Sequence, residues 1–302
     1  EEAVAFRVVE AYLAVLQKKA DEETARDALT YYENAAKDLG KRFELGLARK
    51  LDYSRAIQQR ESASADFTAA KNALSIARID LFTLLRLSPG ADVEVVGELE
   101  AAAASVNREE SVAKALAERP DLKGQKTAAT IQKTAVDIAR GGMRPIVTLT
   151  APYQLDYDST PASAAADDDW LATLTMKVPL FDGGLTRGKV MQEQAALNQA
   201  QQAVAKKEDA VRAEVSQASL SVESAAETVK AARKSLELAS ENLRLAEVGY
   251  REGVNTQLDV LSARTTLTGA RTALSSALKA YRMALAGLWK AEGSLVKRIL
   301  ER

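Results

Sequence analysis

The side chains that could do chemistry in this chain are carboxylates, hydroxyls and cationic groups, because the sequence contains neither histidine nor cysteine. Without histidine the chain lacks the commonest general base and metal ligand, and without cysteine it lacks thiolate nucleophiles, thiolate metal sites and disulfides. Lysine and arginine number 41 against 42 aspartates and glutamates, which argues against a general nucleic-acid-binding protein. No arrangement of carboxylates suits an enzyme, so we expect no catalytic residue, no metal site and no cofactor.

The most informative polar groups lie in a segment that the chain contains twice. The first copy runs from Phe43 to Tyr53 and the second from Tyr250 to Val260, and they align without a gap at an offset of 207 (253 minus 46). An aromatic residue, a glycine and a Leu-Asp pair occupy equivalent places in both copies, and an alanine follows each copy at an equivalent place (Ala56 and Ala263). A repeat spaced this widely indicates two structurally equivalent halves, each with a helical turn at its centre.

Long helices must position both copies. Helical patterns flank the first copy over about 1–40 and 48–87, and the second over about 185–248 and from Val260 to Ala291. The helix before the second copy would measure about 95 Å at 1.5 Å per residue. Its apolar positions step by seven, with one step of four: Leu197, Val204, Val211, Ala218, Val222, Val229, Leu236, Leu243 and Tyr250. Such heptads, with a second seam of alanines, predict antiparallel coiled-coil helical hairpins whose tips lie at the repeated glycines.

Residues 145–181 have a different period. Apolar and polar residues alternate from Val147 to Tyr157 and again from Trp170 to Leu180, which predicts a β-hairpin with strands about ten residues long and one apolar face. Strands of about 9–11 residues with this alternation suit a transmembrane barrel, but a hairpin lying on a soluble core would show the same pattern. A further short strand is expected over 93–96. No run of about 18 apolar residues occurs, so we expect no transmembrane helix.

The fold class is therefore mainly α with a β-hairpin. We divide the chain into a first-repeat helical hairpin, a mixed region, a helix leading to the β-hairpin (and to the membrane, if the strands form a barrel), the β-hairpin, a second-repeat helical hairpin and a C-terminal tail. The corresponding ranges are 1–87, 88–120, 121–144, 145–181, 182–292 and 293–302.

In its motifs and their order the chain resembles the TolC-like outer-membrane factors, the outer membrane efflux protein family. The resemblance rests on Arg119-Pro120-Asp121-Leu122 opening a helix, on the strand end from Val178 to Gly184, and on the tip from Gly253 to Ala263. It implies a homotrimer in the outer membrane of a Gram-negative bacterium, extending into the periplasm. Strands from each subunit would close a β-barrel, and the long helices would form an α-barrel tunnel.

The resemblance also implies the function and the partners. The protein would be the passive exit duct of a tripartite efflux or type I secretion system, with a gate at the helical tips. It would bind outer-membrane lipid, a periplasmic adaptor protein and an inner-membrane pump of the RND, ABC or MFS type. The alternative is a periplasmic coiled-coil structural or adaptor protein without a pore of its own.

One departure from the family is large. Family members carry a β-hairpin in each repeat, whereas this chain has one. Since 120 minus 207 is −87, the repeat predicts that roughly 90 residues precede Glu1 in an N-terminally truncated or longer protein.

The resemblance assigns roles to individual residues of the gate. Asp259 matches an inward-facing tip carboxylate, and a threefold ring of such groups would select cations. Family members often carry a second acid one turn later, where this chain has Ser262. Tyr250 and Asp52 match residues that join neighbouring helical hairpins in the closed state. The basic partner of that latch falls at Asn255, which is uncharged, so Arg49, Lys50 or Arg251 would have to replace it.

Two further sets of residues follow from the same resemblance. The exposed tips would dock on the adaptor, and aromatic side chains near the loop end of the β-hairpin would form part of a girdle at the membrane surface. The tip residues are Leu45, Gly46, Leu47, Glu252, Gly253 and Val254, and the girdle residues are Tyr153, Tyr157 and Trp170.

Overall fold

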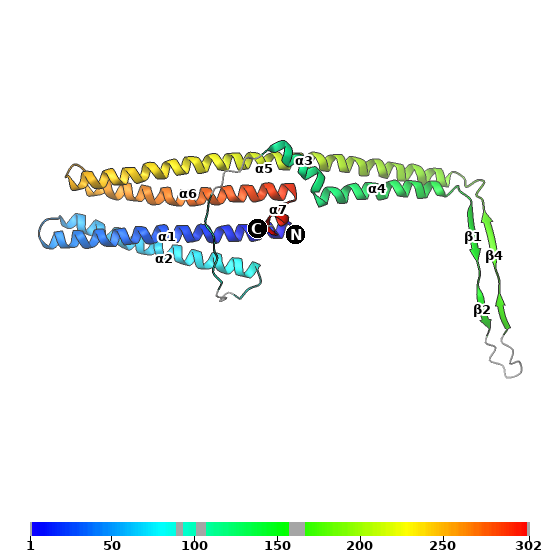
Figure 1. Ribbon diagram of the computed structural model, residues 1–302, viewed down its shortest axis with the longest axis horizontal. Coiled ribbons are helices and arrows are strands. Elements are labelled where there is room, and N and C mark those ends of the chain that lie inside the picture. Colours follow the sequence, from blue (N-terminus) through cyan, green and yellow to red (C-terminus); the bar gives the residue numbers. More distant parts are fainter. Residues whose placement is uncertain (1, 89–92, 101–106, 157–166, 301–302) are drawn as a thin grey trace, which may run out of the picture. The chain divides into compact units, whose positions relative to one another are not determined.

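The computed structural model describes residues 2–88, 93–100, 107–156 and 167–300 (Figure 1). The chain divides into two compact units, one made of Glu1–Arg119 with Val211–Arg302 and the other of Pro120–Ala210. Each unit is described by itself. Within the described helices, no segment is both long and apolar enough to cross a membrane.

The first unit is built from two antiparallel helical hairpins, as the heptads predicted. Helix α1 (Glu2–Glu44) pairs with α2 (Lys50–Leu84). The last part of α5 (Leu185–Arg251) pairs with α6 (Gln257–Glu292) through shared apolar clusters. Two shorter helices, α3 (Arg108–Glu118) and α7 (Leu295–Leu300), pack on the end of α6 that lies away from its tip.

Many core residues of the second helical hairpin lie at the predicted heptad and alanine positions: Val211, Val222, Val229, Leu243, Ala239, Ala246, Ala270 and Ala277 are buried. Val215 and Ser219 are buried as well, although they lie outside the predicted series. In the first hairpin the buried alanines are Ala28, Ala36, Ala56 and Ala63. Alanine at these contacts lets the helix backbones approach closely, so narrow two-helix cores suffice to hold long hairpins together.

A buried carboxylate fastens the short helices of this unit. The side chain of Glu292 is 5% exposed. It accepts hydrogen bonds from the hydroxyls of Ser111 (2.8 Å) and Ser294 (3.0 Å), and it pairs with Lys114 at 3.6 Å. Because Ser111 and Lys114 lie on α3 and Ser294 precedes α7, one satisfied carboxylate holds both helices against the end of α6.

The strand predicted over 93–96 is wrong. Residues 93–100 contain no strand, and the side chain of Val95 lies in the apolar cluster of α1 and α2 with Leu13 and Phe82. The Tyr12 hydroxyl donates to the carbonyl of Val96 at 2.9 Å, so a side chain serves that acceptor instead of a neighbouring strand.

The second unit holds α4 (Pro120–Gly141), the first part of α5, and the β-hairpin. The hairpin consists of β1 (Ile146–Thr150), β2 (Tyr153–Asp156), β3 (Asp167–Trp170) and β4 (Thr173–Lys177). β1 pairs with β4 and β2 with β3, both antiparallel. The residue numbers of every cross-strand pair add to 323, as in Ile146↔Lys177 and Tyr153↔Trp170, so a single register runs through both pieces.

The prediction of two uninterrupted strands of about ten residues therefore needs correction. Each strand is split into segments of five and four residues. The interruption lies at Pro152, whose partner in the register is Leu171. Proline has no N–H to donate, so one of the two ladder bonds at this pair is lost, while the Leu171 N–H still donates to the Pro152 carbonyl at 3.2 Å.

Candidate functional site

The tip of the first helical hairpin is closed by a Schellman motif. Gly46 has φ +72°, its N–H donates to the Phe43 carbonyl (3.0 Å), and the Leu47 N–H donates to the Arg42 carbonyl (2.7 Å). These bonds satisfy the last carbonyls of α1, and the positive φ explains the glycine at this position.

The tip of the second hairpin repeats the same motif. Gly253 has φ +77°, its N–H donates to the Tyr250 carbonyl (3.2 Å), and the Val254 N–H donates to the Gly249 carbonyl (2.8 Å). All four residues lie 207 positions after their counterparts in the first tip. The repeat found in the sequence is thus a repeat of hydrogen bonding.

Both tips carry exposed apolar side chains. Leu45 and Leu47 are 73% and 74% exposed in the first tip, and Val254 is 78% exposed in the second. Glu252 is exposed beside it. A surface of this kind can bury apolar area against a partner without rearranging the hairpin.

Asp259 lies at the third position of α6, where it forms a capping box with Thr256. Its Oδ2 accepts from the Thr256 backbone N–H (2.8 Å) and hydroxyl (2.7 Å), and its own N–H donates to the Thr256 hydroxyl (3.3 Å). The hydrogen bonds from Thr256 hold the pKa of the exposed Asp259 carboxyl below its usual value. The carboxylate is therefore charged at neutral pH, and Ser262, one turn on, is exposed as well.

Asp52 is the repeat counterpart of Asp259 and lies at the third position of α2. Its side chain is 18% exposed and pairs with Arg49, whose Nε lies 2.9 Å from Oδ2. The tip carboxylate of each hairpin thus bonds to the N-cap residue of its own helix. In the first hairpin the partner is cationic, whereas in the second it is a neutral threonine.

Tyr250 and Asn255 belong to the packing of the second tip. Tyr250 is half-buried against the cluster that contains Leu243 and Val260. Asn255 covers Gly249, where an added Cβ would lie 2.5 Å from the Asn255 Nδ2. Among the residues that the structure describes, no hydrogen bond joins Tyr250 to Asp52.

Two of the three residues predicted to form the aromatic girdle lie in the described part of the chain, and they face each other across the β-hairpin. Tyr153 and Trp170 are register partners, 61% and 74% exposed. Val147↔Met176 and Leu149↔Leu174 are non-polar pairs with the same parity, and Thr148↔Thr175 and Thr150↔Thr173 occupy the opposite face. The hairpin therefore has an exposed apolar face and a threonine face. Tyr157 lies outside the described residues.

The two helical hairpins meet where α1 packs against α6, a set of contacts called the joint below. The joint was not predicted from the sequence. Near the tips Arg264 lies over the ring of Tyr31 (4.6 Å to the centroid) and donates to the Asp27 carbonyl (3.0 Å). Burial raises the pKa of Tyr31 to about 12, and the neighbouring Glu247 carboxylate, which accepts a hydrogen bond from the Tyr31 hydroxyl, acts in the same direction. Arg271 pairs with the Asp27 carboxylate at 2.7 Å. None of these residues belongs to a recognisable local motif, so only the three-dimensional arrangement reveals them.

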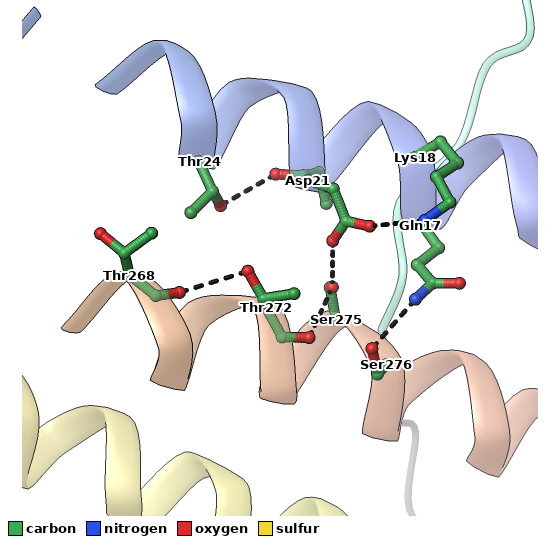
Figure 2. Close-up of polar contacts among 9 residues, drawn as sticks. Gln17, Lys18, Asp21, Thr24, Thr268, Thr272, Ser275 and Ser276 are labelled. Atoms are coloured by element: carbon green, nitrogen blue, oxygen red, sulfur yellow. Dashed lines mark hydrogen bonds and ion pairs between the residues drawn. The ribbon is translucent and has the colours of Figure 1, made fainter. Parts of the chain in front are cut away.

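Farther from the tips the same joint continues as a row of polar contacts between α1 and α6. Figure 2 shows the Ser275 hydroxyl donating to Asp21 (2.7 Å) and the Gln17 amide donating to the Ser276 hydroxyl (3.0 Å). Lys18 pairs with Asp21 from within α1. In the described part of the chain, no group of three or more acidic side chains is arranged to hold a metal ion.

Comparison with known proteins places this geometry in a family. The family model described as outer membrane efflux protein matches residues 112–294. Outer membrane protein TolC of Vibrio cholerae is 23% identical over 205 residues, which cover 65% of this chain and 46% of that protein. Fusaric acid resistance protein FusA of Burkholderia cepacia is 24% identical over 187 residues, or 61% of this chain and 35% of that protein. The chain thus spans less than half of the length of these curated relatives.

Solved structures show the same fold. The outer membrane protein VceC of Vibrio cholerae superposes with a TM-score of 0.75 at 21% identity, over 97% of this chain and 70% of VceC. The MtrE outer membrane channel of Neisseria gonorrhoeae, in its open state, gives a TM-score of 0.68 at 22% identity, over 97% of this chain and 69% of MtrE.

Proposed function

Because this chain belongs to the outer membrane efflux protein family, we propose that it forms part of the passive exit duct of a tripartite efflux or type I secretion system. Family membership locates the protein at the outer membrane, extending into the periplasm. The observation that carries the proposal is the combination, inside the matched residues, of a two-faced β-hairpin with a long helical hairpin closed by a Schellman tip.

In this proposal the β-hairpin is the membrane part. Its face with Leu149 and Leu174 contacts lipid, and its threonine face lines the pore, as expected for a barrel whose strands alternate apolar-out and polar-in. Hairpins of three subunits contribute to one barrel, and the exposed pair Tyr153 and Trp170 lies at the membrane surface.

Fluorescence of Trp170 tests this placement, because these 302 residues contain two tryptophans and Trp289 can be replaced by phenylalanine. Any tryptophan elsewhere in the full-length protein is replaced by phenylalanine in both of the proteins compared. In vesicles of brominated lipid, the full-length Trp289→Phe protein should show strong quenching of Trp170. A matched Trp170→Phe protein, which reports Trp289 alone, should show little. Equal and weak quenching of both proteins would favour the alternative, a periplasmic coiled-coil spacer without a pore.

The gate of the proposed duct lies at the helical tips. Both hydrogen bonds from Thr256 go to Asp259 Oδ2, so among the described residues Oδ1 keeps its lone pairs for a cation. A ring of Asp259 carboxylates from three subunits would make the narrow end cation-selective, with Ser262 supplying a neutral ring one turn further along.

A latch between Tyr250 and Asp52 would hold the gate closed, and the Arg49–Asp52 pair competes with it inside the chain. Single-channel recordings of Tyr250→Phe and Asp52→Ala test this idea. An unchanged open probability in both variants would remove the latch from the proposal. Asn255 carries no charge in the position of the basic partner, so Arg49, Lys50 or Arg251 would take the place of that partner.

The tips also supply the docking surface of the duct. The exposed side chains of Leu45, Leu47 and Val254 meet the helical hairpin of a periplasmic adaptor, which connects the homotrimer to an inner-membrane pump of the RND, ABC or MFS type. Gly46 and Gly253 keep these side chains at the apex by allowing the chain to reverse within the five residues that join the helices of each hairpin.

A further inference from the structure

The two tips repeat one backbone motif but carry different charge. From Lys41 to Arg55 the first tip has five cationic and two acidic residues, a net charge of +3. The equivalent stretch of the second tip, from Val248 to Ser262, has one arginine and two acidic residues, a net charge of −1. Both tips lie at the same end of the first unit (Figure 1). A partner that approaches this end therefore meets two surfaces of opposite sign.

The difference lies mainly in the cations. Each cationic position of the first tip has an uncharged counterpart 207 residues later. The pairs are Lys41 and Val248, Arg42 and Gly249, Arg49 and Thr256, Lys50 and Gln257, and Arg55 and Ser262. The Schellman turn does not require these cations, since the second tip closes by the same hydrogen bonds without them. Their concentration at the first tip is thus not explained by the fold of the hairpin.

Three of the five cations are available to a partner. Arg42 pairs with Asp38 at 3.0 Å, and Arg49 pairs with Asp52 at 2.9 Å. The others are exposed and make no ion pair with any described residue: Lys41, Lys50 and Arg55. Ions that are fully solvated contribute little to the stability of the hairpin itself, so these three charges are free to act between molecules.

The first tip is also the more apolar of the two. Leu45 and Leu47 at its apex are 73% and 74% exposed, and Leu51 in the first turn of α2 is 54% exposed. In the second tip the counterpart of Leu45 is the exposed acid Glu252. The first tip thus presents leucines flanked by unpaired cations. On such a surface the apolar area is buried on binding, while the charges around it select the partner by sign.

We propose that the two tips are non-equivalent docking sites, and that the first one binds the acidic, apolar end of a partner's helical hairpin through its leucines and unpaired cations. The proposal rests on the proposed function, in which the helical hairpin of an adaptor meets the tips. At the second tip the exposed carboxylates of Glu252 and Asp259 repel the same acidic end. Attraction at one tip and repulsion at the other together determine which tip an acidic adaptor hairpin occupies.

Peptide binding to the full-length protein tests this preference. The probe is a synthetic helical-hairpin peptide with leucines and glutamates at its turn, and the reference peptide has glutamines in place of the glutamates. Fluorescence anisotropy at low salt should show tighter binding of the glutamate peptide. Each exposed ion pair is worth about two- to threefold in affinity, so Lys50→Gln with Arg55→Gln should weaken this binding about fivefold. High salt should weaken it as well.

Helix α2 supplies a matched control. Lys71→Gln with Arg78→Gln removes one lysine and one arginine that are likewise exposed on α2 and make no ion pair with described residues. Lys71 is 21 residues from Lys50, or about 30 Å along the helix, so this variant should bind the glutamate peptide like the parent protein. The reversed variant, Lys50→Glu with Arg55→Glu, should instead prefer a peptide with lysines in place of the glutamates, which verifies that the altered tip still folds.

The outcomes separate this proposal from the duct. Equal affinity for the glutamate and glutamine peptides, or an equal loss in the tip variant and the control, would overturn the preference of the first tip. So would capture of the tip by phosphatidylglycerol vesicles in place of the glutamate peptide. If that protein still conducts in planar bilayers, the duct stands. Selective binding of the glutamate peptide by a protein that never conducts would support the docking site and reject the duct.

Discussion

Each long helix of the first unit is followed by a residue with a positive φ, and substitutions at these residues test the repeat through their effect on local stability. Gly253 and Gly46 have φ near +75°, and a Cβ built on either glycine meets nothing within 4 Å. The penalty of a side chain there is therefore backbone strain alone, about 1–2 kcal/mol. Alanine also makes the unfolded chain less flexible, which returns about 0.4–1 kcal/mol. Gly253→Ala should thus destabilise the end of α5 by about 1 kcal/mol.

The same offset predicts a change of opposite sign at the other end of the repeat. Gly293, with φ +73°, closes α6 by bonds from its own N–H to Lys290 and from the Ser294 N–H to Trp289. Its counterpart is Arg86, which holds φ +55° after α2. The equivalent bonds run from the Arg86 N–H to the Thr83 carbonyl and from the Leu87 N–H to the Phe82 carbonyl. Because an exposed arginine bears the strain that glycine avoids, Arg86→Gly should stabilise the end of α2 by about 1 kcal/mol.

Amide hydrogen exchange measured by mass spectrometry reports these local changes in the full-length protein. A change of 1 kcal/mol corresponds to about fivefold in exchange rate when exchange follows local opening. Peptides ending near 254 should exchange about fivefold faster in Gly253→Ala, and peptides ending near 87 about fivefold slower in Arg86→Gly. Exchange that is unaltered at both sites would refute the reasoning from backbone strain.

Three further predictions concern the gate, the joint and the membrane hairpin. Thr256→Ala should destabilise α6 by about 1 kcal/mol but keep cation selectivity at neutral pH, whereas Asp259→Asn should abolish selectivity; reversal potentials and thermal unfolding separate the two effects. Because the folded-state pKa of Asp259 is depressed, its stabilising contribution is present above its ordinary pKa and is lost as pH falls through the lowered value. Over that pH range the free energy of unfolding should therefore fall less with decreasing pH in Asp259→Asn than in the parent protein. Arg264→Ala should loosen the joint within the chain and raise the open probability, while exposed Arg244→Ala should not, as single-channel recording can show. Leu149→Arg should impair membrane assembly by about 2–4 kcal/mol and Thr150→Arg much less, as measured by the yield of folded protein in vesicles.

The long helices and their tips could be predicted from the sequence because the causes are local. Heptads, the alanine seam and one glycine per tip determine α1, α2, α5 and α6 and their antiparallel pairing. The resemblance to the outer membrane efflux proteins came from short motifs in the right order, and the family model agrees with it.

What the sequence did not predict depends on contacts between distant residues. The Tyr31–Arg264 contact joins positions 233 apart (264 minus 31), and no local pattern marks either residue. The interruption of the β-hairpin was visible in principle, since Pro152 lies inside the alternating run. The expected strand at 93–96 failed because apolar residues in an extended segment pack equally well against helices as in a sheet.

For the candidate gate residues, too, the sequence predicts the positions but not the side-chain contacts. That Asp52 and Asp259 occupy equivalent places followed from the repeat alone. Their different partners, a cation at Arg49 and a neutral hydroxyl at Thr256, appear only with the side chains in place. The ring of Asp259, the latch of Tyr250 with Asp52 and the docking of the tips remain predictions.

Single-channel conductance of the purified full-length protein in planar bilayers tests the central claim most directly. A passive duct with tip carboxylates should give discrete conductance steps that select cations, and Asp259→Asn should retain the steps while losing the selectivity. An assembled trimer that inserts into the bilayer and never conducts, in the parent protein and in Arg264→Ala alike, would contradict the account.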